Sequence, residues 1–102
     1  MNKYKNIFTE IDGIKFHSKK EAARYVNLKI LDKAGEIREL DMQVRYTINV
    51  GTMKVCTYIA DFTYIDKYGT KIVEDVKGIR TAIYKLKAKL MLAVYGIKIL
   101  ET

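Results

Sequence analysis

The 102-residue chain has no proline, no tryptophan, one cysteine and one histidine. The single Cys56 excludes an intramolecular disulfide, and no cluster of cysteine and histidine has the spacing of a zinc site. No segment approaches the roughly 20 apolar residues that cross a membrane, and the N-terminal residues lack the apolar core of a signal peptide. Without low-complexity segments or proline-rich linkers, the sequence predicts a single domain over residues 1–102 in a reducing, cytoplasmic environment.

Acidic residues are also few, since 12 Asp and Glu stand against 19 Lys and Arg, a formal charge of +7. In a domain of this size the excess favours an anionic partner, with nucleic acid first and a membrane surface second. Hydrophobic residues make up 49% of the chain, enough for one core. We therefore expect DNA as the partner, with no membrane attachment and no small-molecule cofactor.

Two turn signals predict β-hairpins. Asp12-Gly13 lies between apolar residues and is typical of a type I′ turn, which predicts a hairpin over residues 5–17. Apolar and β-branched residues fill both halves of residues 58–77, and residues 66–69, Asp-Lys-Tyr-Gly, supply the turn between them. Gly69 can adopt the positive φ that such a turn requires.

Two segments have the periodicity of amphipathic helices. The first begins at Ser18, whose Ser-x-x-Glu capping box ends at Glu21, and it runs to about Ala34. The second spans about Thr81 to Tyr95, and a glycine follows each helix as a stop signal. The expected apolar stripe of the first helix is Ala22, Tyr25, Val26, Leu28, Ile30 and Leu31. The expected inner face of the second is Ile83, Leu86, Leu90 and Ala93 or Val94.

The remaining apolar segments are typical of strands. Residues 37–40 and 43–50 precede the central hairpin, and residues 97–100 form a short final strand. The order is hairpin, helix, three strands, helix, strand. It predicts a mixed α/β or α+β layer fold, with a central mixed sheet flanked by two helices and an N-terminal hairpin.

Two carboxylates, Asp61 and Asp75, interrupt the apolar arms of the central hairpin. If residues 67–69 form a three-residue loop, these aspartates face each other with Cβ atoms roughly 5 Å apart, where like charges are destabilising. Lys77 then projects from the same face, because strand side chains alternate with a period of two. A slip of one residue would place Glu74 opposite Asp61 instead. We prefer the first register because it gathers Lys77 into the cluster.

The Asp61, Asp75 and Lys77 cluster has the chemistry of a Mg²⁺ or Mn²⁺ site. Mg²⁺ is typically held by one or two carboxylates together with waters and substrate phosphate. A bound ion would relieve the repulsion between the aspartates and polarise a phosphoryl oxygen, while Lys77 could offset the charge that develops on the phosphate. The alternative is a salt-bridged patch on an exposed sheet face. The apolar neighbours of both acids disfavour that alternative.

Other residues have two compatible explanations. Glu21 is explained as the capping-box glutamate, and it joins the acidic cluster if the first helical turn packs against the hairpin. Gln43 is polar in an apolar strand, which an edge position explains equally well, and Glu74 is a second choice for the site. Basic residues on or beside the two helices, with one tyrosine, either contact DNA or form solvated helix faces. These candidates are Lys19, Lys20, Arg24, Arg80, Tyr84, Lys85, Lys87 and Lys89.

Residues 59–62, Ile-Ala-Asp-Phe, and 73–78, Val-Glu-Asp-Val-Lys-Gly, resemble motifs II and III of the PD-(D/E)XK nuclease superfamily. Together with residues 12–25, Asp-Gly-Ile-Lys-Phe-His-Ser-Lys-Lys-Glu-Ala-Ala-Arg-Tyr, they are similar to the small phage-encoded family DUF1064 over nearly the whole chain. The chain departs from the superfamily pattern in two ways. It has no proline before Asp61, and it has aspartate where glutamate is commoner in motif III, which leaves the choice between Asp75 and Glu74 open.

The resemblance implies a restriction-endonuclease-like core in which Asp61 and Asp75 bind the metal and Lys77 is the catalytic lysine. It makes Glu21 the further acid from the first helix and a third metal ligand. It implies a Mg²⁺- or Mn²⁺-dependent DNA endonuclease of phage DNA processing or recombination, acting on branched DNA such as a Holliday junction. Cutting two strands favours a homodimer. The rival functions are a non-catalytic DNA-binding protein on the same fold and an interaction module that binds an acidic protein.

Overall fold

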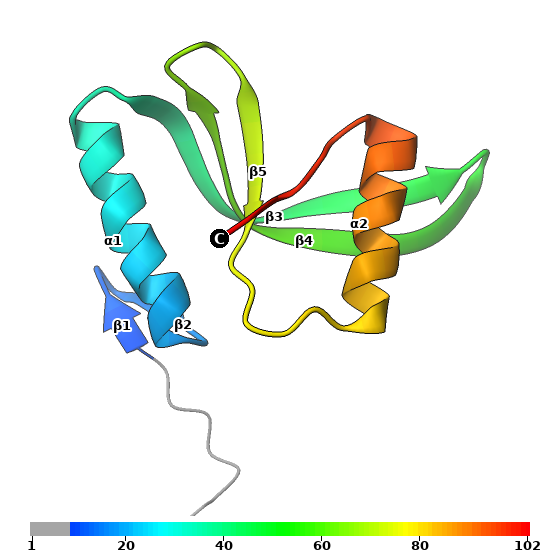
Figure 1. Ribbon diagram of the computed structural model, residues 1–102, viewed down its shortest axis with the longest axis horizontal. Helices are drawn as coiled ribbons and strands as arrows, with labels where there is room; N and C mark the ends of the chain where they lie inside the picture. The colour runs from blue at the N-terminus through cyan, green and yellow to red at the C-terminus, as the bar shows by residue number, and fades with distance from the viewer. Residues whose placement is uncertain (1–8) are drawn as a thin grey trace, which may run out of the picture.

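The computed structural model describes residues 9–102. Strands β1 (Thr9–Ile11) and β2 (Ile14–Phe16) form an antiparallel hairpin, and helix α1 (Lys19–Lys33) follows. The remaining elements are β3 (Ile37–Val50), β4 (Met53–Asp66), β5 (Lys71–Asp75), α2 (Ala82–Tyr95) and β6 (Leu100–Glu101). In Figure 1, α1 and α2 lie on the two sides of β5, and the N-terminal hairpin lies beside the start of α1.

The other four strands form one mixed sheet in the order β3-β4-β5-β6. Neighbours are antiparallel except β5 and β6, which are parallel. The predicted mixed α+β fold, with two helices and an N-terminal antiparallel hairpin, is therefore confirmed. One detail differs, because residues 37–50 form a single strand with an irregularity between Arg38 and Asp41, not two separate strands.

The caps of both helices are those expected from the sequence. Ser18 Oγ accepts a hydrogen bond from the Glu21 backbone N–H at 3.0 Å, and Thr81 Oγ1 accepts one from the Tyr84 N–H at 3.1 Å. These bonds satisfy N–H groups that lack a partner within the first helical turn. Gly96 ends α2 with a φ of 68°, in the left-handed region.

The preferred register of the central hairpin is confirmed. Phe62 pairs with Glu74, and the Asp66 backbone N–H donates to the Thr70 carbonyl at 2.9 Å, which closes a three-residue loop. The paired positions end at Phe62 and Glu74, and Asp61 is joined to the end of β5 by the Val76 backbone N–H, which donates to Asp61 Oδ2 at 2.8 Å. The side chain of Glu74 lies on the other face of β5, as the alternation of strand side chains requires.

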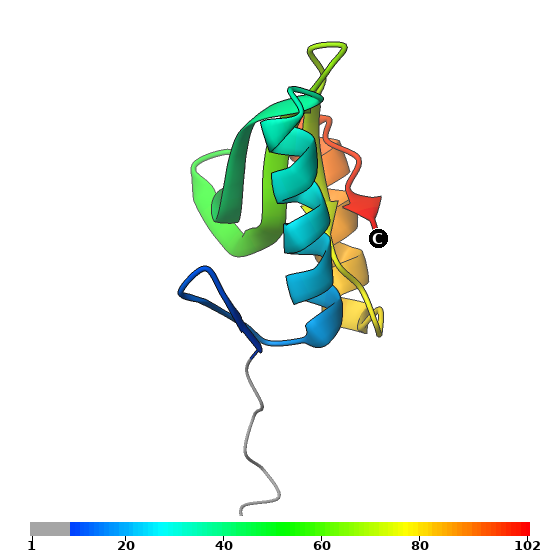
Figure 2. The ribbon, with the colours of Figure 1, turned by 90° about the vertical axis from the view of Figure 1, so that its left-hand side faces the viewer.

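The core has two parts, and strand β4 passes from one to the other. Phe62 and Tyr64 pack with α1, whereas Tyr58 and Ala60 pack with α2. Side chains two positions apart normally share one face of a strand. The strand must therefore bend between Ala60 and Phe62, at Asp61. Figure 2, viewed from the side of α1, shows α2 behind α1, so the bend lies between the two helical layers.

The expected inner face of α2 is largely wrong. The face that packs on the sheet carries Tyr84, Ala88 and Met91, whereas Ile83 is 68% exposed and Leu86 is 58% exposed. Only Leu90 of the expected set packs partly against this core. The physical reason is a second apolar stripe on the same helix, rotated away from the sheet. In α1 the expected Ala22, Tyr25 and Leu28 are buried, but Val26 and Ile30 are exposed.

The corrected face of α2 can be tested by comparing two truncations in one helix. Met91 is fully buried, so Met91→Ala should lower the free energy of unfolding by about 2–5 kcal/mol. Leu86→Ala removes an exposed side chain and should change it by no more than about 0.5 kcal/mol. Urea denaturation followed by circular dichroism measures both. An equal loss in the two variants would contradict this orientation of α2.

Candidate active site

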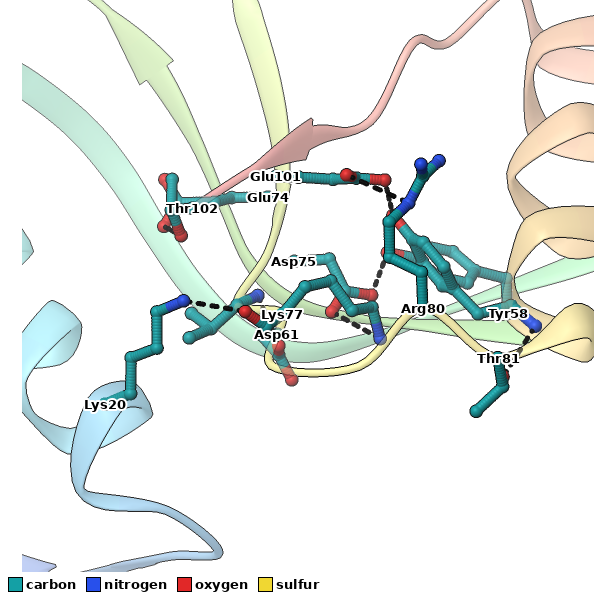
Figure 3. Close-up of polar contacts among 12 residues, drawn as sticks. Lys20, Tyr58, Asp61, Glu74, Asp75, Lys77, Arg80, Thr81, Glu101 and Thr102 are labelled. Atoms are coloured by element: carbon teal, nitrogen blue, oxygen red, sulfur yellow. Dashed lines mark hydrogen bonds and ion pairs between the residues drawn. The ribbon is translucent and has the colours of Figure 1, made fainter.

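Asp75 ends β5 as a buried carboxylate with a donor on each oxygen. Its Oδ2 accepts a hydrogen bond from the Tyr58 hydroxyl at 2.7 Å, and its Oδ1 lies 2.9 Å from Lys77 Nζ. Figure 3 shows these side chains converging from β4, β5 and the segment that follows β5. Burial, together with the bond to Asp75, raises the pKa of Tyr58, so this hydroxyl remains a donor at neutral pH.

Lys77 is fixed by contacts on two sides. Its Nζ lies 3.9 Å from the centroid of the Tyr84 ring, a cation–π contact, and its backbone carbonyl accepts a bond from Lys20 Nζ at 2.6 Å. The Lys20 bond connects the first turn of α1 to the segment after β5 (Figure 3). The ammonium of Lys77 is therefore held beside Asp75 and does not extend into solvent.

Asp61 lies at the bend of β4. Its Oδ2 accepts a bond from the Val76 backbone N–H at 2.8 Å, and its Oδ1 accepts a longer one from Gln43 Nε2 at 3.4 Å. Burial, together with the charges of Asp75 and Glu21, raises the pKa of Asp61 to about 6, against the lowering effect of the Val76 bond. The negative charge of the pair is therefore only partly offset by the protein.

Glu21 reaches this cluster from the first turn of α1. Its side chain lines a cavity of about 150 Å³ together with His17, Gln43 and Asp61. Burial raises the pKa of Glu21, the charge of His17 lowers it and the charge of Asp75 raises it. The Glu21 N–H donates to Ser18 Oγ, which is one half of the capping box, and Glu21 also lines the cavity beside Asp61. Gln43 likewise lies both on an edge strand and beside Asp61.

Glu74 has a structural environment. It is fully buried and receives two bonds from the Arg24 guanidinium, at 2.6 and 2.9 Å, and one from the Tyr64 hydroxyl at 2.7 Å. The Thr102 hydroxyl adds a fourth at 3.1 Å. These contacts separate Glu74 from the aspartate pair and favour Asp75 as the second acid of the site. Arg24, expected among the DNA contacts, is instead held in an ion pair with Glu74.

The other expected DNA contacts lie on several faces. Lys87 lines a cavity of about 270 Å³ at Asp75 and Lys77, whereas Lys85 and Lys89 line a different cavity with Arg80. Lys19 is exposed at the start of α1. Tyr84 is 6% exposed, so its ring supports Lys77 and is not available to stack on a base.

The sequence did not point to Tyr58 or Glu101. The Tyr58 hydroxyl binds Asp75, and Glu101 Oε2 accepts a bond from the Tyr84 hydroxyl at 2.7 Å. Buried tyrosine hydroxyls usually find a partner, which is a general signal for such contacts but does not identify the acceptor. Only the tertiary structure pairs these residues.

The chemistry of the donors fits a hard divalent cation. Among residues 9–102, no group of three or more His, Cys, Asp or Glu side chains is arranged to hold a metal ion. The opposed oxygens of Asp61 and Asp75 do match Mg²⁺, which often takes one or two carboxylates and completes its shell with water. Burial and the neighbouring charges of Asp75 and Glu21 raise the pKa of Asp61. A bound cation would offset that negative charge.

The family model described as "Protein of unknown function (DUF1064)" matches residues 1–99. The chain belongs to this family. No curated protein and no solved structure is significantly similar to the chain. The site of this DUF1064 protein is therefore interpreted from its own geometry. Within residues 9–102, no helix is long and apolar enough to cross a membrane.

The raised pKa of Asp61 predicts a pH dependence of stability in this DUF1064 protein. The carboxyl has a pKa near 3.9 in an unfolded chain and about 6 in the folded protein, so between these values the folded state binds more protons. The contribution of Asp61 to the free energy of unfolding therefore falls as the pH rises from about 4 to 6. Asp61→Asn should be at least as stable as wild type at pH 7, with the difference shrinking toward pH 4.

Urea denaturation at pH 4, 5, 6 and 7 in EDTA measures this effect. Glu36→Gln is a control, because Glu36 forms an exposed ion pair with Lys67 at 3.8 Å and should shift stability little at any pH. An Asp61→Asn variant that becomes progressively less stable than wild type between pH 4 and pH 7 would disprove the assignment.

Proposed function

We propose that this protein is a Mg²⁺- or Mn²⁺-dependent endonuclease that hydrolyses DNA phosphodiester bonds on a restriction-endonuclease-like, PD-(D/E)XK core. The observation that carries the proposal is the convergence of Asp61, Asp75 and Lys77 at the bend of the sheet. The Val76 N–H, next to Asp75, donates to Asp61 Oδ2 at 2.8 Å, the charge of Asp75 acts on Asp61, and Lys77 Nζ lies 2.9 Å from Asp75. Two adjacent carboxylates, of which Asp75 is buried and Asp61 half-buried, are destabilising in a purely structural patch, which supports a functional explanation.

Each residue has a distinct role in this proposal. Asp61, Asp75 and Glu21 would hold the metal ion. The bound ion would supply Lewis acidity, polarising the phosphoryl oxygen and lowering the pKa of a water. Lys77 would place its positive charge beside the scissile phosphate, where negative charge increases in the transition state. Tyr58 and Tyr84 keep Asp75 and Lys77 in these positions.

We further propose a role in phage DNA processing or recombination in the cytoplasm, with branched DNA such as a Holliday junction as a substrate. The charge of +7 supports nucleic-acid binding. The substrate class rests on analogy with nucleases of this fold. Homodimerisation would allow two strands to be cut.

One observation favours a second candidate, a non-catalytic DNA-binding protein on the same fold. Both oxygens of Asp75 already have donors within the protein, Tyr58 and Lys77. A carboxylate compensated in this way does not require a metal ion. The two candidates differ in metal-dependent cleavage, not in DNA affinity.

Cleavage of labelled DNA tests the proposal. Linear duplex, single strand, flap and four-way junction are each incubated with Mg²⁺, Mn²⁺ or EDTA. We expect metal-dependent cleavage, abolished by Asp61→Asn and reduced on the order of 10²–10³-fold by Lys77→Ala, because a charge that stabilises the transition state is lost. Lys71→Ala, an exposed lysine at the other end of β5, should cleave like wild type. Binding without cleavage under every metal would favour the non-catalytic candidate.

Metal binding can also be measured without turnover. A ligand at 100 times its Kd stabilises the folded state by about 2.7 kcal/mol. Mg²⁺ or Mn²⁺ should therefore raise the Tm of wild type and Lys71→Ala, but not that of Asp61→Asn or Asp75→Asn. Equal shifts in wild type and both aspartate variants would show that the ion binds elsewhere.

A further inference from the structure

A cavity of about 310 Å³ lies between α2 and the segment that leads into β6. We call it the second cavity, because it lies apart from the cavities at the acidic cluster. Its charged lining consists of Arg80 before α2, Lys85 and Lys89 on α2, and Lys98. Leu92 and Ile99 contribute apolar surface. The cavity thus combines several cations with an apolar wall, and it is the largest of the cavities described above.

This cavity and the acidic cluster lie on opposite flanks of α2. Lys85, Lys89 and Leu92 recur at helical spacing on one flank, whereas Ile83 and Lys87 line the cavity at Asp75 on the other. A helix with its side chains is about 10–12 Å across. The positive charges of α2 therefore belong to two separate sites, not to one continuous stripe.

The charge of the second cavity is poorly balanced within the protein. Its one carboxylate, Glu101, is already engaged by Arg80 Nε at 3.3 Å and by the Tyr84 hydroxyl at 2.7 Å. Lys85, Lys89 and Lys98 form no ion pair within residues 9–102. Like charges one helical turn apart are destabilising, as for Lys85 and Lys89. An anionic ligand would relieve this repulsion.

We infer that this cavity is a second nucleic-acid site, which binds the phosphate backbone of a single strand. The volume is at the lower end of the range for small-ligand pockets, so it suits a nucleotide unit and not a paired duplex. Lysines match phosphates as point charges, and the apolar wall of Leu92 and Ile99 suits a sugar or base. Identifying the anion as nucleic acid rests on the proposed function.

Direct contacts connect the second cavity to the acidic cluster. Arg80 at the cavity rim pairs with Glu101, Glu101 binds the Tyr84 hydroxyl, and the Tyr84 ring supports Lys77 (Figure 3 labels Arg80, Glu101 and Lys77). A strand held in the cavity is therefore fixed relative to Asp75. A strand that leaves its duplex unpaired, as at a flap, can enter the cavity, whereas the strands of a linear duplex or of a fully paired four-way junction remain bound to their complements. The inferred substrate class is DNA with an unpaired strand.

The experiment measures binding of labelled single-stranded, flap and duplex oligonucleotides in EDTA, between 50 and 200 mM salt. The variant replaces the three lysines: Lys85→Gln, Lys89→Gln and Lys98→Gln. Each phosphate contact contributes about 0.7 to the salt slope of single-strand binding, so the slope should fall by about 2. Affinity for single-stranded and flap DNA should fall about tenfold or more, and that for duplex should fall less. The matched control, Lys29→Gln with Lys33→Gln on α1, should behave like wild type.

Further variants and competitors make the outcomes distinct. Replacing the same three lysines by arginine should retain the salt slope, and Lys98→Gln alone, which lies outside α2, should lower it by about 0.7. An unchanged slope in a triple variant that still unfolds cooperatively would overturn the inference. An unlabelled mononucleotide and an unlabelled single strand are also compared as competitors at the same phosphate concentration. If the mononucleotide displaced the labelled strand as well as the single strand did, the ligand would be a free nucleotide and the inference would be overturned.

The same measurement separates this inference from the nuclease proposal. Asp61→Asn should bind single strands in EDTA at least as tightly as wild type, since it removes a negative charge and none of the lysines. Lysine-dependent binding by a wild-type protein that cuts no DNA would retain the second site and reject the nuclease. If the wild-type protein cut DNA while the triple lysine variant bound single strands normally, the nuclease proposal would stand and the second site would be rejected.

Discussion

The opposed carboxylates of Asp61 and Asp75 constrain much of the surrounding structure. Groups from several elements are needed to accommodate them: the Tyr58 hydroxyl from β4, the Val76 N–H, and Lys77 after β5. The ring of Tyr84, on α2, then holds Lys77 in place. Because buried charge without partners is costly, these contacts tie α2 and the segment after β5 to the bend of the sheet.

Adjacent carboxylates on β5 have opposite roles because strand side chains alternate. Glu74 points toward α1 and is fully compensated by Arg24, Tyr64 and Thr102. Such a network is costly to break but carries no excess charge. Asp75 points toward the other layer, where Asp61 adds a second negative charge. The two adjacent acids therefore differ in the donors that each one meets, because Glu74 accepts bonds from three side chains and Asp75 is contacted by Tyr58 and Lys77.

The sequence predicted the features that depend on local rules. The loop of residues 67–69 set the hairpin register, and Ser18 and Thr81 set the starts of both helices. The rotation of α2 could not be predicted, because the helix has two apolar stripes of similar strength. The choice between them depends on the bond from Tyr84 to Glu101, 17 residues away, which has no local signature. The partner of Arg24, 50 residues away, was hidden for the same reason.

The two charged clusters on either flank of α2 share one physical property. The acids at the bend and the three lysines at the second cavity each bring like charges together, and like charges in contact reduce stability. Lys77 offsets part of the acidic charge, whereas the three lysines form no ion pair within residues 9–102. A metal ion would offset the first cluster and phosphates would offset the second, so a metal-bound nucleic acid would carry both counter-charges. Neither cluster alone requires such a ligand, since a lone anion or a lone cation would suffice for one of them. Their arrangement around a single helix, connected through Glu101 and Tyr84, is what favours one ligand that spans both.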